Sequence, residues 1–391
     1  MEQFETIFQI LKASLWGTVF TGNVTENDYL EMQKHAITPL VANKLDDFEM
    51  APALKKRWKE DILRHVSYGV QYRYCQSHLS ISVPYVILKG TSSAQYYPYP
   101  ELRTLGDIDL MPSRTDFEVV CNELINDGFV EITSKEKEER GRHRCFKKLG
   151  ILIEVHAFFA VLLDPEKAKL LDDLILDNLT PSHLLPDEIN GLVLLEHIYQ
   201  HLEAGLGLRQ ILDWMMYVDK CLTDEKWLVF KQLARNVGLE KLAIAITRMC
   251  EIYLGLAERQ WCNKAKDDEC RQLMEYVMEC GNFGNKMHSE EDISKNVFTL
   301  ASTPKATFRL LQERGQQNWK AVRKCSFLKY FAWIYQAGRY GFRGLRRKGA
   351  VSKIKNEYFA AKKRRTLFEA LDVKQGSKGM IFYINGKYIK K

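Results

Sequence analysis

The sequence predicts an α+β fold in which a small mixed sheet has helical regions before and after it along the chain. Apolar residues recur at three- and four-residue spacing within residues 1–80, which is typical of helices. Short apolar runs alternate with helix-like segments in residues 81–163, which indicates a mixed sheet. Helical spacing returns over residues 187–285.

The chain has 391 residues, of which 46% are hydrophobic, so we expect a substantial core divided over two or three domains. Pro181 and Pro186 mark one boundary. The expected domains are a helical region at 1–80, the sheet core at 81–185, a helical domain at 186–290 and a basic region with a terminal hairpin at 291–391.

The sheet core is predicted element by element from apolar runs, caps and turn residues. Thr91 or Ser92 is the expected N-cap of its first helix and Ser113 that of its second, which Gly128 ends. We expect strands at 85–90, 107–112 and 151–159, helices at 91–97 and 113–129, and a charged hairpin region at 131–150.

The composition also bounds the location of the protein. No stretch approaches 18 continuous apolar residues, and the first residues lack a basic segment before a long apolar run. The nine cysteines are odd in number and scattered, with no CxxC pair. We therefore expect no membrane span, no signal peptide and reduced thiols in a cytoplasmic protein.

Two aspartates stand one residue apart in the apolar run "GDIDLM". Side chains at positions i and i+2 of a strand share a face, so Asp107 and Asp109 project together while Ile108 points to the other side. Glu154 is a lone acid in the later apolar run "ILIEVHAFF". Converging carboxylates suit magnesium, and we expect the three acids to hold metal ions. The plainer interpretation of such a triplet is a solvated strand end.

A possible phosphate-binding turn precedes the aspartates. A helix that starts after Gly90 directs free N–H groups toward the tip of the preceding strand, and Gly90 permits close approach of the backbone. Lys89, Thr91, Ser92 and Arg103 can add charge and hydroxyl groups. Lys89 and Arg103 can equally be ordinary surface charges, and Gly90 an ordinary turn.

Together these residues resemble the polymerase-β-like nucleotidyltransferase superfamily, and most closely a group of bacterial proteins named nucleotidyltransferase family proteins. The resemblance spans roughly residues 80–220 and places the sheet core in that fold. It is carried by Lys89-Gly90, Tyr97-Pro98, Arg103, Asp107-Ile108-Asp109-Leu110, Glu154, His156, His197, His201, Gly207, Arg209 and Asp213. The turn is Gly-Thr-Ser where the superfamily usually has Gly-Ser or Gly-Gly, and the loop from Gly90 to Asp107 is longer than usual.

The resemblance implies an enzyme that transfers a nucleoside monophosphate from an NTP to a hydroxyl group and releases pyrophosphate. Asp107 and Asp109 would hold two Mg²⁺ ions, with Mn²⁺ possible, and Glu154 would be the third ligand and help to deprotonate the acceptor. The acceptor would be a small molecule, a glycan precursor or a protein. The alternative is a catalytically inactive module on the same fold that binds nucleotide or RNA.

Several polar residues beyond the acids have two interpretations. His197 and His201 are four residues apart on a predicted helix, so they line either a domain interface or a substrate pocket. Arg209 and Asp213 have the same spacing, which first suggests a helix ion pair; otherwise Arg209 contacts phosphate or substrate. His156 shares the face of Glu154, either behind the metal ligands or as an ordinary sheet residue.

The charge is strongly segregated. Residues 314–391 contain 21 Lys or Arg against three acids, a net charge of +18, so residues 1–313 carry −11 of the total of +7. Aromatic residues are interleaved with these bases between Phe327 and Arg347. Such a segment can bind an anionic membrane at its inner face, bind nucleic acid, or pack its aromatics while its charges are solvated.

Overall fold

The computed structural model divides into two compact units, residues 1–285 with 379–391, and residues 286–378. It describes residues 1–133, 141–202, 205–286, 326–345, 362–373, 381–384 and 387–390, with short pieces between 308 and 323. The ranges predicted as separate domains at 1–80, 81–185 and 186–290 therefore lie in the first unit, apart from residues 286–290. The boundaries between these three ranges stay a prediction.

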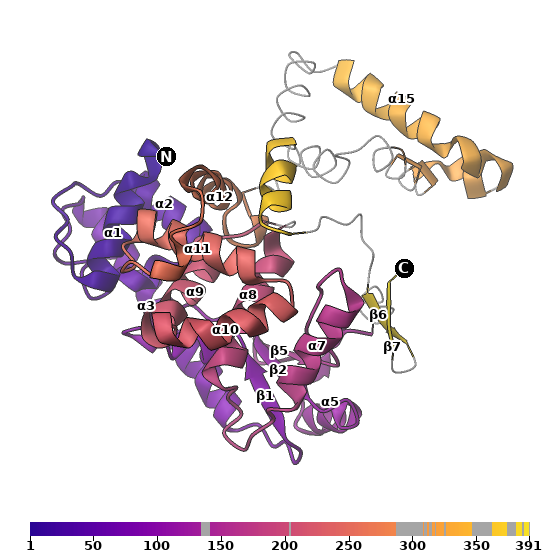
Figure 1. Ribbon diagram of the computed structural model, residues 1–391, viewed down its shortest axis with the longest axis horizontal. Coiled ribbons are helices and arrows are strands. Elements are labelled where there is room, and N and C mark those ends of the chain that lie inside the picture. Colours follow the sequence, from indigo (N-terminus) through magenta and orange to yellow (C-terminus); the bar gives the residue numbers. More distant parts are fainter. Residues whose placement is uncertain are drawn as a thin grey trace. The chain divides into compact units, whose positions relative to one another are not determined.

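A five-stranded mixed sheet lies within the first unit (Figure 1), in the spatial order β1-β2-β5-β4-β3. Its strands are β1 (Tyr85–Leu88), β2 (Ile108–Pro112), β3 (Val130–Glu131), β4 (His143–Lys148) and β5 (Ile151–His156). The central pair β2 and β5 is parallel, and the other neighbours are antiparallel. A mixed sheet among many helices confirms the predicted α+β class.

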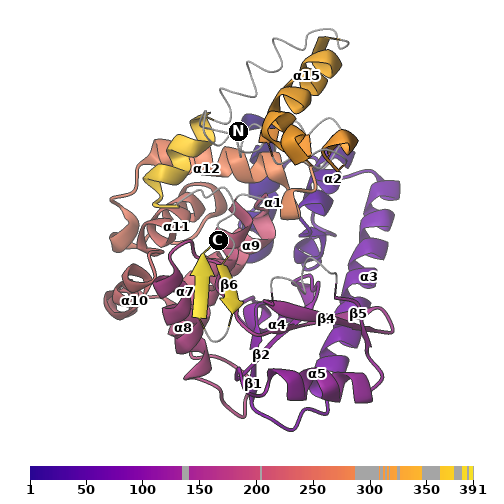
Figure 2. The same ribbon diagram turned by 90° about the vertical axis from the view of Figure 1, so that its right-hand side faces the viewer.

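Helices precede, interrupt and follow the sheet along the chain (Figure 2). Before it come α1 (Glu5–Trp16), α2 (Glu26–Lys34) and α3 (Pro52–Ser77). Within it are α4 (Gly90–Ala94) and α5 (Phe117–Asn126). After it come α7 (Pro165–Leu176), α8 (Asp187–Leu202), α9 (Leu208–Cys221), α10 (Asp224–Asn236), α11 (Glu240–Leu254) and α12 (Asp267–Cys280).

One face of the sheet is apolar and forms a core with α3 and α5. Each fully buried side chain of this kind contributes roughly 1.5–3 kcal/mol to stability. The core includes Tyr72 of α3, Val120 and Leu124 of α5, Ile108 and Leu110 of β2, and Ile153 and Val155 of β5. Because successive side chains of a strand alternate, Asp109 and Glu154 between them face the opposite side of the sheet.

A two-residue turn fixes the register of β4 against β5. Leu149 and Gly150 both have positive φ, at 49° and 87°, the backbone that tight hairpin turns require. The turn brings His143 opposite His156 and Cys145 opposite Glu154. These four side chains belong to the same face as Asp109, because Asp109 is also the register partner of Glu154.

The structure corrects two predicted helix starts. The N-cap of α4 is Lys89, whereas Thr91 and Ser92 lie inside the helix. The N-cap of α5 is Asp116; Ser113 Oγ instead accepts from the Asp116 backbone N–H at 3.2 Å, before the helix begins. Gly128, with a φ of 84°, follows the end of α5 as predicted. Part of the predicted hairpin region, residues 134–140, lies outside the described residues.

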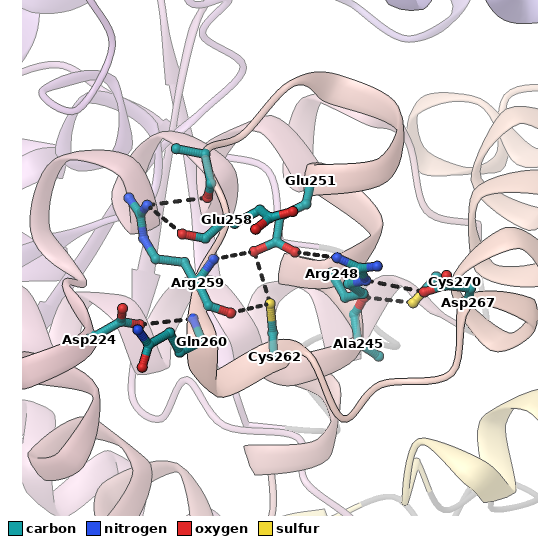
Figure 3. A network of polar contacts seen from close by, with 11 residues as sticks. Asp224, Ala245, Arg248, Glu251, Glu258, Arg259, Gln260, Cys262, Asp267 and Cys270 are labelled. Atoms are coloured by element: carbon teal, nitrogen blue, oxygen red, sulfur yellow. Dashed lines mark hydrogen bonds and ion pairs between the residues drawn. The ribbon is translucent and has the colours of Figure 1, made fainter.

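A polar network ties α11 to the loop and helix that follow it (Figure 3). The Glu251 carboxylate accepts from the Arg259 backbone N–H at 2.6 Å and from the Cys262 thiol at 3.0 Å. Arg248 donates to Glu251 at 3.0 Å and to Asp267 at 3.1 Å. Each of these carboxylates therefore has a donor supplied by the chain itself.

The second unit contains α15 (Ala332–Leu345), preceded by short 3₁₀ segments at Lys320–Arg323 and Ser326–Phe331. Phe327 and Tyr330 are exposed, and Lys329 Nζ lies 5.1 Å from the centre of the Tyr330 ring. No helix among the described residues is both long and apolar enough for a membrane span. Binding of this segment to a membrane or to nucleic acid stays a prediction.

The end of the chain forms the predicted hairpin. The strands β6 (Ile381–Ile384) and β7 (Lys387–Lys390) pair antiparallel, with Ile384 opposite Lys387. Its expected turn residues, Asn385 and Gly386, lie outside the described residues.

Candidate active site

The three predicted acids line one cavity of about 170 Å³. Asp109 and Glu154 are neighbours across the parallel pair β2 and β5, and Asp107 precedes Asp109 by two residues on the same side. An oxygen of Asp109, an oxygen of Glu154 and a ring nitrogen of His156 lie within 4.8 Å of one another. In the fold, therefore, Asp107, Asp109 and Glu154 lie close together at one cavity.

Asp109 is almost completely buried, with 2% of its surface exposed. The Lys89 ammonium and the His156 Nε2 each lie 2.8 Å from its Oδ1. Lys89 reaches this position from the end of β1, where its φ is 54°. Burial by itself would lower the pKa of Lys89, but Asp109 and Asp107 outweigh it and raise that pKa, so Lys89 remains a cation here.

Burial and repulsion between the acids raise the pKa of both aspartates. Repulsion from Asp109, together with burial, raises the pKa of Asp107 to about 6. Burial raises the pKa of Asp109 to about 6 despite the opposing attraction of Lys89, and Glu154 adds to the rise. Carboxylate oxygens in such an arrangement are the donors that Mg²⁺ and Mn²⁺ prefer. The residues therefore fit a divalent cation, with Lys89 as the counter-charge that the chain itself provides.

Arg209 of α9 is a buried cation at the same cavity. It is 8% exposed, and within the described parts of the chain its Nε has no hydrogen-bond partner. Its guanidinium lies 5.0 Å from the centre of the Phe283 ring. Burial, with repulsion from Arg103, lowers the pKa of Arg209 to about 10, so it stays charged at neutral pH. A buried guanidinium that lines a cavity is suited to an anion such as phosphate.

The helical spacing predicted an ion pair between Arg209 and Asp213, but Asp213 pairs with a different arginine. Its carboxylate instead accepts two hydrogen bonds from Arg103, at 3.0 and 2.5 Å, and one from the Tyr97 hydroxyl at 2.9 Å. Arg103 is 5% exposed, so this is a buried bidentate ion pair. The pairing explains why Arg209, although closer in sequence, lacks this carboxylate as a hydrogen-bond partner.

The predicted phosphate-binding turn is only partly directed at the cavity. Gly90 lines it with a φ of 46°, and a β-carbon there would lie 3.4 Å from the Asp107 carbonyl oxygen. The Thr91 hydroxyl donates to Gln76 of α3 at 2.6 Å, and the Ser92 hydroxyl donates to Asn190 of α8 at 3.2 Å. Both hydroxyl groups therefore join the turn to neighbouring helices.

His156, His197 and His201 all line the cavity. Burial, reinforced by the positive charge of Lys89, lowers the pKa of His156 and of His201 to about 3 and holds that of His197 well below its usual value. Neutral imidazoles neither add to the positive charge nor act as acids at pH 7. They are therefore available as hydrogen-bond partners or as ligands.

A family model described as "uncharacterised nucleotidyltransferase" matches residues 29–255, which include the whole sheet and all of the acids. The chain belongs to this nucleotidyltransferase family. Neither the curated proteins nor the solved structures contain a match to the chain. Family membership confirms the resemblance to nucleotidyltransferases at this level.

The structure also brings to the site of this nucleotidyltransferase residues that sequence reasoning missed. Arg142 and Gln200 line the cavity, and Arg142 donates to the Phe159 carbonyl oxygen at 2.6 Å. His143 also lines it, and Cys145 donates to Glu154 Oε1 at 3.4 Å. The segment "HRCFKK" does not alternate apolar and polar residues, so the sequence carried no local strand signal for His143 and Cys145.

Proposed function

We propose that the chain is a magnesium-dependent nucleotidyltransferase that moves a nucleoside monophosphate from an NTP to a hydroxyl acceptor, with release of pyrophosphate. The observation that carries this proposal is that Asp107, Asp109 and Glu154 share one cavity with Arg209, whose Nε has no hydrogen-bond partner among the described residues. Acids for cations and a buried guanidinium for phosphate are the two features that nucleotidyl transfer needs together. Membership of the nucleotidyltransferase family supports the same reaction class.

The acids would hold two ions. When bound, these ions would activate the acceptor hydroxyl and stabilise the leaving pyrophosphate. Asp109 of β2 and Asp107, the residue just before β2, both line the cavity, so they can bind and orient the ions between them. Glu154 is 14% exposed and stands beside Asp109, where it can contribute a ligand oxygen and receive the acceptor proton.

The cations would hold the triphosphate. Arg209 Nε has no hydrogen-bond partner in the part of the chain that the structure describes, whereas Arg103 already forms an ion pair with Asp213. The Lys89 ammonium contacts Asp109 and can turn to a phosphate oxygen once Asp109 has another counter-charge. We assign to Arg103 the indirect role of fixing the loop that leads to Asp107.

The volume of the cavity limits which parts of the substrates it can enclose. Pockets that enclose a whole ligand commonly measure roughly 300–1,000 Å³. At about 170 Å³ this cavity accommodates ions and phosphate groups, so the nucleoside and the acceptor would extend beyond its open side. The acceptor is a small molecule, a glycan precursor or a protein in this proposal.

Pyrophosphate release tests the reaction. The purified chain is incubated with Mg²⁺ and each of four labelled NTPs, with and without pooled small-molecule and protein acceptors. We expect release or label transfer with at least one NTP, and a loss of about 1,000-fold or more in the D107N/D109N double variant. The matched control is E251Q, which alters a buried carboxylate outside the cavity. NTP binding without any transfer would instead indicate an inactive nucleotide-binding module.

A further inference from the structure

Four potential metal ligands form a square on strands β4 and β5. His143 and Cys145 are two residues apart on β4, and Glu154 and His156 are two residues apart on β5. The register pairs His143 with His156 and Cys145 with Glu154. Because paired residues of antiparallel strands project to the same face, all four side chains lie on the cavity side of the sheet.

The two oxygens of the Glu154 carboxylate contact different members of this group of four. Oε1 lies 3.6 Å from His143 Nε2 and 3.4 Å from Cys145 Sγ. Oε2 lies 3.9 Å from His156 Nε2, on the side of Asp109. One ligand atom from each of His143, Cys145 and Glu154 falls within 4.8 Å of the other two. Oε2 is therefore near His156, whereas Oε1 is near the His143 nitrogen and the Cys145 sulfur.

We propose that His143, Cys145 and Glu154 bind a transition-metal ion of intermediate softness, with Zn²⁺ as the best-fitting class. A nitrogen, a sulfur and an oxygen donor suit such an ion, whereas Mg²⁺ selects oxygen alone. On binding, the Cys145 thiol releases its proton to solvent and the sulfur takes the ion as a thiolate. Three protein ligands leave a position open for water or substrate, as in catalytic rather than structural zinc sites.

This site differs from the one proposed for nucleotidyl transfer. It shares only Glu154 with that site, and Glu154 would then bridge the transition-metal ion and the ions held by the aspartates. The thiolate and the carboxylate carry two negative charges that match one divalent ion. A second buried cysteine–glutamate pair, Cys262 and Glu251, provides a comparison at 3.0 Å. That pair belongs to no three-ligand group in the described part of the chain, so a cysteine beside a glutamate does not by itself make a site.

Cobalt is the probe for this site, because Co²⁺ occupies zinc sites and shows a near-ultraviolet charge-transfer band when a thiolate binds it. The full-length, metal-stripped protein is titrated with Co²⁺ at pH 7.5. We expect the band to saturate at about one ion per chain and to be abolished by Zn²⁺ but not by excess Mg²⁺. A wild-type protein that gives no such band at saturating Co²⁺ would overturn the proposal.

Variants assign the band to its ligands. C145S should abolish it, whereas C262S, the matched control, and D107N should retain it. H143N should weaken Co²⁺ binding at least about tenfold, and it provides an independent test if C145S does not fold. Circular dichroism establishes folding for each variant. Persistence of the band in C145S, or unchanged Co²⁺ affinity in H143N, refutes the site, while the transfer activity of the D107N/D109N variant is judged separately.

Discussion

Two buried carboxylates in the same unit, Glu251 and Asp109, have different surroundings. Glu251 has a side chain that is 3% exposed, and Arg248, the Arg259 backbone N–H and the Cys262 thiol all donate to it. Asp109 is 1% exposed in its side chain and has the Lys89 ammonium and His156 as partners. However, Asp107 and Glu154 stand beside it and add further negative charge.

The difference shows how burial alone fails to distinguish a structural acid from a functional one. Around Glu251 the chain supplies enough donors, so nothing further is needed to stabilise the charge. Around Asp109, burial together with repulsion from neighbouring acids raises the pKa of Asp109 and of Asp107 to about 6 despite the attraction of Lys89. A similar difference separates the arginines, since Arg103 forms an ion pair with Asp213, whereas Arg209 Nε has no hydrogen-bond partner within the described ranges. The following experiments test this distinction.

The largest expected effect concerns the two arginines. R103M leaves Asp213 buried without its cation and should lower the free energy of unfolding by about 3–5 kcal/mol. R209M removes a guanidinium that forms no ion pair with the residues the structure describes, so it should change that free energy by less than about 1 kcal/mol while weakening NTP binding about tenfold or more. Urea denaturation and calorimetric titration with NTP measure these quantities. Equal destabilisation by both variants would contradict the assignment.

The next effect is the pH dependence of Mg²⁺ binding. Both aspartates have a pKa of about 6 and are increasingly protonated below it, and only their ionised forms bind the cation. Affinity for Mg²⁺ should therefore fall as the pH is lowered, by about 100-fold between pH 7 and pH 5 if both protons must leave. Calorimetric titration with MgCl₂ in the absence of nucleotide measures it. An affinity that stays constant over this range would show that these carboxylates are not the ligands.

Global stability is a poorer measure of that titration, because the histidines work in the opposite direction. Burial lowers the pKa of His156 and of His201 to about 3, so the stability linked to them is lost as the pH falls below about 6.5. The raised pKa of the aspartates acts in the other sense, since it favours the folded state as the pH falls toward 4. The two contributions oppose each other in a melting curve.

The smallest effect is a pair of opposite changes in stability. In metal-free protein at pH 7.5, D107N removes the repulsion with Asp109 and should raise the free energy of unfolding by about 1 kcal/mol. E251Q removes a carboxylate that donors surround and should lower it by about 1–3 kcal/mol. Urea denaturation in the presence of a chelator measures both. A loss of stability in D107N would mean that Asp107 is as well compensated as Glu251.

Sequence reasoning named the acids and several other residues that line the cavity, such as Lys89 and His156, but missed His143 and Cys145. Asp107, Asp109 and Glu154 could be predicted because strand alternation and their apolar flanks are local properties. Cys145 and His143 depend on the register of β4 against β5, which is set by the turn at Leu149 and Gly150 inside a segment that reads only as charged. Because this register depends on how β4 and β5 pair, the sequence of either strand alone does not show it.

The residues predicted to bind phosphate show a second limit of prediction from the sequence. Helical spacing predicted that Arg209 would pair with Asp213. The Asp213 carboxylate instead forms its ion pair with Arg103, which lies in a loop far away in the sequence. The hydroxyl groups of Thr91 and Ser92 are likewise engaged by Gln76 and Asn190, which lie on other helices. Competition between partners far apart in sequence leaves no local pattern, so it appears only when the chain has folded.

The buried pair of Arg103 and Asp213 spans 110 positions of the chain and joins the loop before β2 to α9. A gene fragment that ended at residue 185 would encode every carboxylate of the cavity but not the carboxylate that pairs with Arg103. Such a fragment is therefore not expected to fold by itself as the sheet does in the whole chain, because the loop before β2 would lack its anchor on α9.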